Sequence, residues 1–264
     1  MLTNPRADRV RSVASLSKRS VRERTGRFVV EGPQGVREAV RYAAARVVDI
    51  YLTSQAAQRY AADIVEPALG AGLYVHEATP EVLAAMADAE TPQGVLAVVG
   101  RSDAALDAIL NAGPRLLVFL THVRDPGNAG TVIRAADAAG ADAVLVSAAS
   151  VDVFSPKVVR STAGSLFHLP VVTGLGVEAT LAALRERGIR SLAADGAGAT
   201  VLPDADLSGS HAWVMGNEAW GLPSEIRAQC DDVVRVPIYG KAESLNLAMA
   251  ATVCVYASAG VLTW

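Results

Sequence analysis

Apolar positions in the first hundred residues alternate between short runs and helical stripes. Residues 26–43, "GRFVVEGPQGVREAVRYA", predict a short strand that ends in a Gly-Pro turn, followed by a helix with Val36 and Val40 on one face. Three further apolar runs predict strands: "VVDIYL", "LYVHEA" and "GVLAVV". Helical stretches are predicted between them, at 54–70 and 80–88. Residues 25–100 therefore predict a small α/β unit.

A second series of apolar runs begins at "RLLVFL", residues 115–120. It continues with "DAVLV", "PVV", "RSLAA", "AWVM" and "VVRVPI", with helical segments between the runs. Runs that are apolar at consecutive positions are typical of strands covered on both faces, which predicts a parallel sheet with crossover helices. Residues 100–113 bring charge and glycine after a strand and predict a linker. We expect two domains, 1–105 and 113–264, in an α/β protein.

Composition adds a charge asymmetry to this picture. The chain has 264 residues, 51% of them hydrophobic, and a formal net charge of -3. Residues 1–46 hold 11 Lys and Arg against 4 Asp and Glu, or +7, so the remainder holds 13 against 23, or -10. A basic N-terminal segment favours an anionic partner, although a solvated structural face would show the same excess.

Several classes of protein are disfavoured. Cys230 and Cys254 are too few and too isolated for a disulfide framework or a zinc site, which fits a reducing cytoplasm. The four histidines, at positions 76, 122, 168 and 211, lack metal-ligand spacing, so we expect no metal. Residues 1–27 contain no apolar segment of a secretory signal. The apolar stretch 245–262 is rich in alanine and contains polar residues, which predicts a buried helix and no membrane span.

One glycine pattern predicts a dinucleotide site. Gly174, Gly176 and Ala179 match the G-x-G-x-x-G/A fingerprint between a strand and a helix, and Asp195 ends the next strand. This pattern makes an NAD-dependent oxidoreductase one alternative. Glycine-rich turns of this kind also occur in α/β proteins that bind no ligand there, so the alternative stays open.

A second candidate lies in "THVRDPGNAGTVIRAADAAGADAVLV", residues 121–146. The Asp125-Pro126-Gly127 sequence predicts a turn, and Asn128 is the predicted cap of the following helix. Arg134 lies in an otherwise small and apolar helix. Its place near the carboxyl end of a strand is where open α/β sheets bind ligands, whereas a lone arginine also occurs as a surface or ion-paired residue.

Two further stretches combine glycine with polar side chains. "MGNEAWGLPSEI", residues 215–226, places the Glu218 carboxylate and an indole between two glycines. "VPIYGKAESLNLAMAATV", residues 236–253, breaks a strand and starts the closing helix, with Ser244 as its predicted cap. Neither stretch alone defines a chemistry.

Together, these three stretches resemble, in order and spacing, the three motifs of the SpoU or TrmH family of SPOUT RNA 2'-O-methyltransferases. The resemblance spans about residues 115–262 and includes "FSPKVVRSTAGSLFHLPV" between the first two motifs. The N-terminal part, with "GRFVVEGPQGVREA" and "ETPQGVLAVV", is similar to the ribosomal-protein-L30e-like substrate-binding domain of many members. The residue after Arg134 is often threonine in the family and is Ala135 in this chain.

The resemblance implies a smaller L30e-like domain and a catalytic α/β domain with a mostly parallel sheet and a deep trefoil knot that grips S-adenosyl-L-methionine. The implied cofactor-binding residues are Met215, Gly216, Asn217, Gly221, Leu222, Ile238, Leu245 and Leu247. The implied catalytic residues are Arg134, Asn128, Glu218, Ser244 and Asn246. Glycines suit such a loop because its backbone must come within hydrogen-bonding distance of the cofactor.

Methyl transfer from a sulfonium to a ribose 2'-OH needs an activated hydroxyl, stabilisation of the developing oxyanion and in-line placement of the reacting atoms. A guanidinium is effectively always protonated in proteins, so we favour Arg134 as an electrostatic stabiliser and leave the base open. Glu218 would orient that guanidinium through a charge-assisted hydrogen bond.

The resemblance also implies a homodimer and an RNA substrate, with rRNA preferred over tRNA because of the appended domain. The expected RNA-binding residues are Lys18, Arg19, Arg22, Arg24 and Arg27. A tRNA 2'-O-methyltransferase and a non-catalytic RNA-binding protein of the same fold are the alternatives. The latter would be expected to lack Arg134 or Glu218, and both are present.

Overall fold

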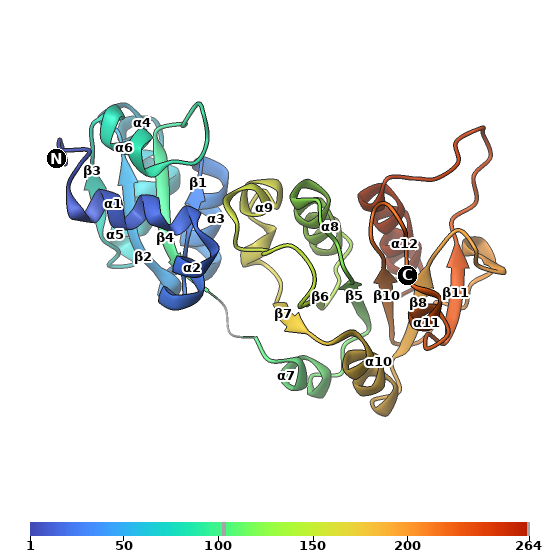
Figure 1. Cartoon of the computed structure of the whole chain (residues 1–264). Coiled ribbons are helices and arrows are strands. Elements are labelled where there is room, and N and C mark those ends of the chain that lie inside the picture. Colours follow the sequence, from blue (N-terminus) through green and yellow to red (C-terminus); the bar gives the residue numbers. More distant parts are fainter. Residues whose placement is uncertain (102–103, 263–264) are drawn as a thin grey trace. The chain divides into compact units, whose positions relative to one another are not determined.

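The computed structural model describes residues 1–101 and 104–262, which form two compact units (Figure 1). Unit 1 holds residues 1–101 together with 152–168, and unit 2 holds the other described residues. The segment 152–168 had been expected in the second domain, but its contacts place it in unit 1. The predicted domains, 1–105 and 113–264, differ from the two units in this segment.

Unit 1 contains a mixed four-stranded sheet in the order β1-β4-β2-β3. Strands β1 (Arg27–Glu31) and β2 (Val47–Leu52) pair antiparallel with β4 (Val95–Gly100), and β2 pairs parallel with β3 (Val75–Glu77). Each strand coincides with a predicted apolar run. The small α/β unit expected from the sequence is confirmed.

Helices accompany this sheet in the described part of unit 1. They are α1 (Asp8–Ala14), α2 (Arg19–Thr25), α3 (Pro33–Ala43), α4 (Ser54–Arg59), α5 (Glu66–Gly70), α6 (Pro80–Met86) and α9 (Pro156–Ser161). The predicted helix at 54–70 is divided into α4, a π-helical turn and α5. Helices α1 and α2 were not predicted, because the apolar pattern here is short: Val10 and Val13 on α1, and Leu16 in the turn that follows it. These three residues pack in one core with Val82 and Leu83 of α6.

Aromatic packing explains why segment 152–168 belongs to unit 1. The ring centroid of Phe28, on β1, lies 5.0 Å from that of Phe154 and 6.4 Å from that of Phe167. The Arg101 guanidinium lies 4.6 Å from the centroid of the Phe154 ring. All three phenylalanines are buried, so the segment completes the core beside β1.

Unit 2 is built on a seven-stranded sheet in the order β7-β6-β5-β10-β8-β11-β9, with every described pair parallel. The strands are β5 (Leu116–Leu120), β6 (Ala143–Ser147), β7 (Val171–Leu175), β8 (Arg190–Ala194), β9 (Thr200–Val201), β10 (His211–Met215) and β11 (Asp232–Arg235). The parallel sheet is confirmed. The two-residue strand β9 carries too short a pattern to be predicted.

Helices cover both faces of this sheet (Figure 1). They are α7 (Leu106–Asn111), α8 (Pro126–Ala138), α10 (Val177–Glu186), α11 (Ser224–Arg227) and α12 (Leu247–Leu262). Helices α7, α10 and α11 share one core with alternate strand residues such as Phe119 and Val214. Helices α8 and α12 pack together, and α12 contacts β10. Helix α7 lies in the stretch that had been predicted as a linker.

Helix α12 is only partly buried. Ala251, Cys254 and Ser258 are buried, whereas Met249 and Tyr256 are exposed. The hydroxyl of Ser258 accepts a hydrogen bond from Trp213 Nε1 at 2.8 Å and lies 2.7 Å from His211 Nε2, which fastens α12 to β10. Within residues 1–101 and 104–262, no helix has the length and apolarity needed to cross a membrane.

Candidate active site

The loop after β10 presents Glu218 from a tight hairpin. Asn217 and Gly221 exchange backbone hydrogen bonds of 2.8 and 2.9 Å, and Gly221 has a φ of +69°, which favours glycine. A Cβ on Gly216 would lie 2.4 Å from the carbonyl carbon of Gly221. The Asn217 side chain donates to the His122 carbonyl at 2.8 Å and accepts from the Ala219 amide at 2.9 Å. The two glycines are therefore required by the hairpin itself.

The Glu218 carboxylate binds the start of α8. It accepts hydrogen bonds from the backbone amides of Arg124 at 3.1 Å and Asp125 at 3.0 Å, and from Asn128 Nδ2 at 3.4 Å. A carboxylate at a helix N-terminus is stabilised by unpaired amides and by the helix dipole. Glu218 thus connects the loop after β10 to the first turn of α8.

Asn246 brings in the third sequence motif. Its Nδ2 donates to Asn128 Oδ1 at 3.0 Å, and its Oδ1 accepts from the amide of Ala248 at 2.8 Å at the start of α12. Asn246 is therefore the cap of α12, and the prediction that Ser244 caps it was wrong. Asn128 is likewise inside α8, because the Asp125 side chain accepts from the Asn128 amide at 2.7 Å and caps the helix.

A cavity lies at the carboxyl ends of β8, β10 and β11, where parallel α/β sheets bind ligands. It is lined by Ala194, Asp195, Gly196, Gly216, Asn217, Glu218, Ala219, Gly221, Val234, Val236, Ile238, Glu243, Ser244, Leu245, Leu247 and Ala250. Its lining includes three carboxylates. Asp195 is held in place by Arg227, whose Nη1 lies 3.1 Å from its carboxylate, and by the Ala197 amide at 2.9 Å.

The cavity lining fits S-adenosyl-L-methionine. Apolar side chains from Ile238, Leu245 and Leu247 suit an adenine ring, and backbone groups of the glycine-framed hairpin are available for hydrogen bonds. Carboxylates suit the ribose hydroxyls and the cationic amino and sulfonium groups of that cofactor. When bound, the cofactor supplies an electrophilic methyl group on a positively charged sulfur.

Most of the residues expected to bind the cofactor line this cavity, but two do not. Met215 and Leu222 are absent from the lining, with exposed fractions of 1% and 2%. Met215 ends β10, and its carbonyl accepts from the Thr121 amide at 2.8 Å and the Thr121 hydroxyl at 2.9 Å. Both side chains are part of the packing beneath the hairpin, so the expectation that they contact the cofactor is not supported by the lining.

Arg134 lies apart from the Glu218 cluster. It is exposed on α8, it is not among the residues that line the cavity, and no described contact joins it to Glu218. Six residues separate it from Asn128, and at about 100° per residue the two side chains point about 120° apart around α8. The expected Glu218–Arg134 hydrogen bond is not among the described contacts within one chain, so it stays a prediction.

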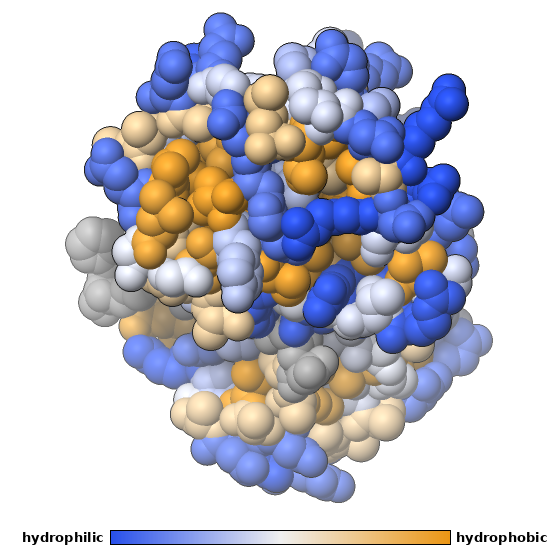
Figure 2. Space-filling model, turned by 90° about the vertical axis from the view of Figure 1, so that its left-hand side faces the viewer, coloured by the Kyte–Doolittle hydropathy of each residue, from blue (hydrophilic) through white to orange (hydrophobic). Residues whose placement is uncertain are grey.

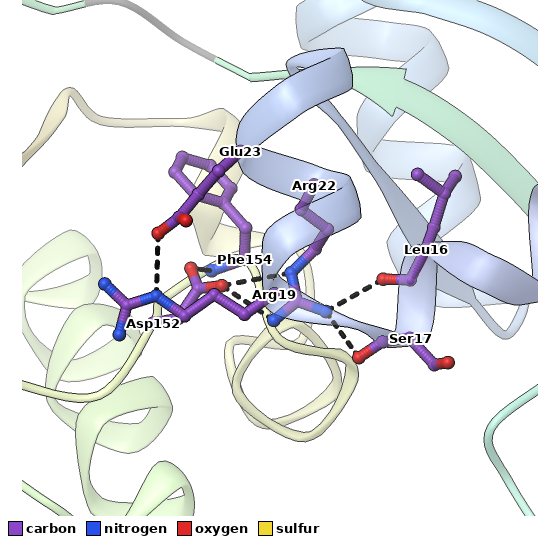
Figure 3. A network of polar contacts seen from close by, with 7 residues as sticks. All are labelled: Leu16, Ser17, Arg19, Arg22, Glu23, Asp152 and Phe154. Atoms are coloured by element: carbon purple, nitrogen blue, oxygen red, sulfur yellow. Dashed lines mark hydrogen bonds and ion pairs between the residues drawn. The ribbon is translucent and has the colours of Figure 1, made fainter.

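One of the five basic residues expected to bind RNA is structural (Figure 3). Arg22 is 3% exposed and donates to Asp152 from Nε at 3.0 Å and from Nη2 at 2.7 Å. Its Nη1 donates to the carbonyls of Leu16 and Ser17. A buried guanidinium whose three nitrogens are all hydrogen-bonded is not available to a phosphate, so the structure does not support Arg22 as an RNA-binding residue.

The other four basic residues are exposed. Arg19 is bonded to Glu23 at 2.7 Å, while Lys18, Arg24 and Arg27 have no ion pair within the described part of the chain. On the face of the molecule drawn in Figure 2, hydrophilic side chains alternate with apolar areas. Lys18, Arg24 and Arg27 remain the strongest candidates for contact with an RNA backbone.

The sheet order excludes the dinucleotide site. A ribose-binding acid lies at the end of the strand next to the glycine-rich turn. Gly174 lies in β7 and Gly176 directly after it, but β6, β5 and β10 separate β7 from β8, and Asp195 follows β8. Asp195 instead lines the cavity at the carboxyl ends of β8, β10 and β11. The oxidoreductase alternative therefore loses its geometric basis.

Sequence reasoning assigned no role in the present site to Asp195, Glu243 or the Arg124 amide. Asp195 carried a signal, since a carboxylate just after a parallel strand is a common ligand-binding position, but it was attributed to another cofactor. The backbone amides carry no signal in the side-chain pattern at all. Their role follows only from where the hairpin places Glu218.

A parallel α/β sheet with a polar-rimmed cavity at its carboxyl edge defines a class of cofactor-binding enzyme domains. Comparison with known proteins identifies the member of that class: residues 115–256 match the SpoU rRNA Methylase family, and residues 7–97 match the MRM3-like substrate binding domain. The chain belongs to the SpoU rRNA methylase family.

Individual relatives agree along nearly the whole chain. The 23S rRNA (guanosine-2'-O-)-methyltransferase RlmB of Bordetella pertussis is 33% identical over 87% of this chain and 96% of its own. A 23S rRNA (uridine(2479)-2'-O)-methyltransferase of Streptomyces viridochromogenes is 32% identical over 92% and 86%. The crystal structure of an AdoMet-bound rRNA methyltransferase from Sinorhizobium meliloti has a TM-score of 0.84 and 27% identity, covering 97% of this chain and 96% of that one. The chain is an S-adenosylmethionine-dependent RNA ribose 2'-O-methyltransferase with an L30e-like N-terminal domain.

Proposed function

We propose that this enzyme methylates a ribose 2'-OH of 23S rRNA in the cytoplasm, in an active site that two copies of the chain complete. The observation that carries the proposal is the cluster in which Glu218 and Asn128 meet Asn246 beside the cavity. The relatives from Bordetella pertussis and Streptomyces viridochromogenes, whose names specify 23S rRNA, support rRNA over tRNA.

The cavity residues hold the cofactor in this account. Gly216, Asn217 and Gly221 offer backbone groups, and Ile238, Leu245 and Leu247 enclose its apolar part. Ser244 lines the same cavity beside Glu243, where a hydroxyl can bind either the cofactor or the ribose. The deep trefoil knot implied by the family resemblance belongs to the same proposal.

Glu218 positions the ribose side of the site. Its carboxylate fixes the Asn128 amide group, and Asn128 in turn accepts from Asn246, so the orientation of both amides is determined by one acid. Fixed polar groups of this kind lower the reorganisation needed when charge develops on the attacking oxygen. Asn128 and Asn246 are the amides of this cluster that can contact a ribose hydroxyl.

Arg134 acts across a dimer interface in this account. It is exposed and lies outside the cavity of its own chain, and α8 packs against α12. The outer face of α12 exposes Met249 at 64%, Val253 at 43% and Tyr256 at 52%. We propose that a second copy covers this apolar face and that Arg134 stabilises the developing oxyanion in the cavity of the other copy.

Proton removal from the 2'-OH is not assigned to Arg134, because its guanidinium is already protonated and cannot accept a further proton. The attacking oxygen displaces the thioether sulfur, so a new O–C bond forms as the C–S bond breaks, and the hydroxyl proton leaves to solvent or to a nearby carboxylate. A guanidinium is suited to the negative charge that this oxygen gains.

The substrate class is tested with RNA from a strain in which this gene is deleted, so that the target ribose is unmethylated. The purified protein is incubated with cofactor labelled in the methyl group and with 23S rRNA or bulk tRNA separately. The proposal predicts label on 23S rRNA and background label on tRNA. Label on tRNA alone would replace it with the tRNA alternative.

A further inference from the structure

Trp220 is a large aromatic residue left exposed beside the active site. It lies two residues after Glu218 in the hairpin closed by Asn217 and Gly221, and 53% of it is exposed. By contrast, Trp213, on β10 and four residues before Asn217, is fully buried. An exposed indole on a loop fixed by its own backbone hydrogen bonds presents a rigid flat surface to solvent.

His122 supports this indole from the neighbouring turn. The two ring centroids are 5.5 Å apart with an interplanar angle of 59°. His122 has a φ of +56°, in the left-handed region that side chains other than glycine rarely adopt. Its amide donates to Ser147 Oγ at 3.1 Å and its carbonyl accepts from Asn217 Nδ2 at 2.8 Å, so the unusual backbone is held at both ends.

Within residues 1–101 and 104–262, no hydrogen bond of the His122 imidazole explains this conformation. Its Nδ1 is buried and lacks a hydrogen-bond partner among the residues that the structure describes. Strained residues of this kind persist where the surroundings enforce them, and they concentrate at binding sites. The left-handed backbone of His122 places its imidazole ring against Trp220.

The aromatic pair does not belong to the cofactor cavity. Neither Trp220 nor His122 lines it, although Asn217, Glu218, Ala219 and Gly221 from the same hairpin do. Arg124, whose amide binds Glu218, is exposed at this edge. An exposed aromatic face and an exposed cation on neighbouring loops are a combination that can bind unpaired nucleotides, through base stacking and phosphate contact.

We propose that Trp220, supported by His122, stacks on an unpaired base of the RNA next to the ribose that receives the methyl group. This proposal rests on the proposed function, since it assumes that RNA enters the site at the Glu218 hairpin. Stacking on an aromatic side chain selects a single-stranded or flipped-out nucleotide over a paired one. Trp220 is thus a positioning and specificity residue for the reaction.

The test compares Trp220→Leu with Trp220→Phe. Leucine keeps apolar bulk but offers no ring, whereas phenylalanine keeps a smaller stacking surface. We expect Trp220→Leu to weaken binding of a single-stranded RNA fragment by roughly 5- to 150-fold, and Trp220→Phe to restore part of that loss. The KM for RNA should rise in the same order, while cofactor affinity measured by calorimetry stays within about twofold of wild type.

An RNA with a single abasic position identifies the stacked base. Abasic positions are introduced one at a time in the fragment, and binding is measured by fluorescence anisotropy. We expect one position to weaken binding by wild type and to have little further effect on Trp220→Leu. Equal binding by wild type and Trp220→Leu, or a loss that adds fully at every abasic position, would overturn the proposal.

Fluorescence anisotropy requires no methyl transfer. Stacking by Trp220 and methylation of 23S rRNA can therefore be rejected independently. A binding loss in Trp220→Leu without any methylation of 23S rRNA would leave stacking intact and reject the proposed substrate. His122→Gly tests the support separately, because glycine accepts the left-handed φ and only the ring is lost. Its thermal unfolding should match wild type or exceed it, and RNA binding as strong as that of wild type would show that Trp220 needs no support from His122.

Discussion

The carboxylate of Glu218 lies 3.0 Å from the backbone nitrogen of Asp125, a residue 93 positions earlier in the chain. Asp125 also caps α8 with its side chain, so two acids with different partners organise the same helix start. Glu218 binds the amides of residues 124 and 125, and Asp125 binds the amide of Asn128. The glycine-framed hairpin thus places the Glu218 carboxylate at the start of α8.

Replacement of Glu218 by glutamine should lower methyl transfer and leave cofactor affinity nearly unchanged. The variant keeps the size of the side chain but loses the charge that strengthens its three hydrogen bonds. Hydrogen bonds to charged groups contribute about 1.5–3 kcal/mol, so a fall in kcat of roughly 10- to 150-fold is expected. Single-turnover kinetics and calorimetry measure the two effects.

Glu225→Gln is the matched control for this experiment. Glu225 lies on α11, is exposed and does not line the cavity. It should behave as wild type in both measurements. If Glu218→Gln methylates RNA at the wild-type rate, the hairpin acid has no role in arranging the site.

Mixed dimers of two inactive variants should regain activity. If Arg134 acts in the cavity of the other copy, a dimer of Arg134→Ala with Glu218→Ala contains one site with both residues intact. Coexpression with two different tags and tandem purification isolates this species. Its activity should approach half that of the wild-type dimer, since one of two sites is restored.

Each parent variant, purified alone, provides the background for that experiment. A tandem-purified mixed dimer that is no more active than its parents would show that Arg134 serves the cavity of its own chain. Recovery of no mixed dimer at all would contradict the proposed α12 interface.

The basic residues of the N-terminal segment should separate into two classes. Arg22→Ala leaves Asp152 without its buried ion partner, and such changes cost about 3–5 kcal/mol of unfolding free energy. Replacement of Lys18, Arg24 and Arg27 by alanine should leave unfolding unchanged. The triple variant should instead lower the slope of log binding constant against log salt by roughly 0.7–0.9 per lost phosphate contact.

Denaturant unfolding gives the unfolding free energy of Arg22→Ala and of the triple variant. RNA binding at several salt concentrations gives the salt slope of each. Arg22→Lys, which keeps a charge but cannot make the same forked bonds, should be intermediate in stability. An unchanged salt slope in the triple variant would remove these three residues from the RNA-binding surface.

Unit 2 should lose stability below about pH 6.5 through His211. Burial lowers the pKa of His211 below its ordinary value of 6.5, although the Gly209 carbonyl opposes this shift. In the unfolded chain the ring takes up a proton as the pH falls through 6.5, whereas the folded protein does so only at lower pH. The unfolded state therefore binds more protons in this window, and acidification favours it.

Denaturant unfolding of wild type and His211→Gln between about pH 8 and pH 5 measures this contribution. Glutamine retains hydrogen-bonding groups near Gly209 and Ser258 but does not titrate. The difference in unfolding free energy between the two proteins should narrow as the pH falls. A constant difference would show that His211 does not titrate differently in the two states.

The strands and the motif residues could be predicted from sequence because they depend on local patterns. Consecutive apolar runs identified β5, β6, β8 and β10, and the order of the three motifs brought Asn128, Glu218 and Asn246 together correctly. Short stripes such as Val10, Val13 and Leu16 gave too little pattern to predict α1.

Other features depend on contacts between distant positions. Arg22 looks like any surface arginine in the sequence, and it becomes structural through its bonds to Asp152, 130 residues away, and to the carbonyls of Leu16 and Ser17. The cap of α12 is the polar side chain that the preceding turn directs at the first free amides of the helix. The sequence predicted Ser244 for this role, and the structure has Asn246. The side of α8 on which Arg134 lies could be calculated, but its distance from Glu218 could not.

Glu218 and Arg134 are proposed to serve methyl transfer to a ribose oxygen. The most direct measurement incubates labelled cofactor with 23S rRNA from the deletion strain, using wild type and Arg134→Ala, and then locates alkali-resistant linkages, which only a 2'-O-methyl group produces. The account predicts one labelled, alkali-resistant linkage with wild type, a loss of orders of magnitude with Arg134→Ala, and cofactor binding retained by both. Label that alkali releases in ordinary mononucleotides would place the methyl group on a base and contradict the account.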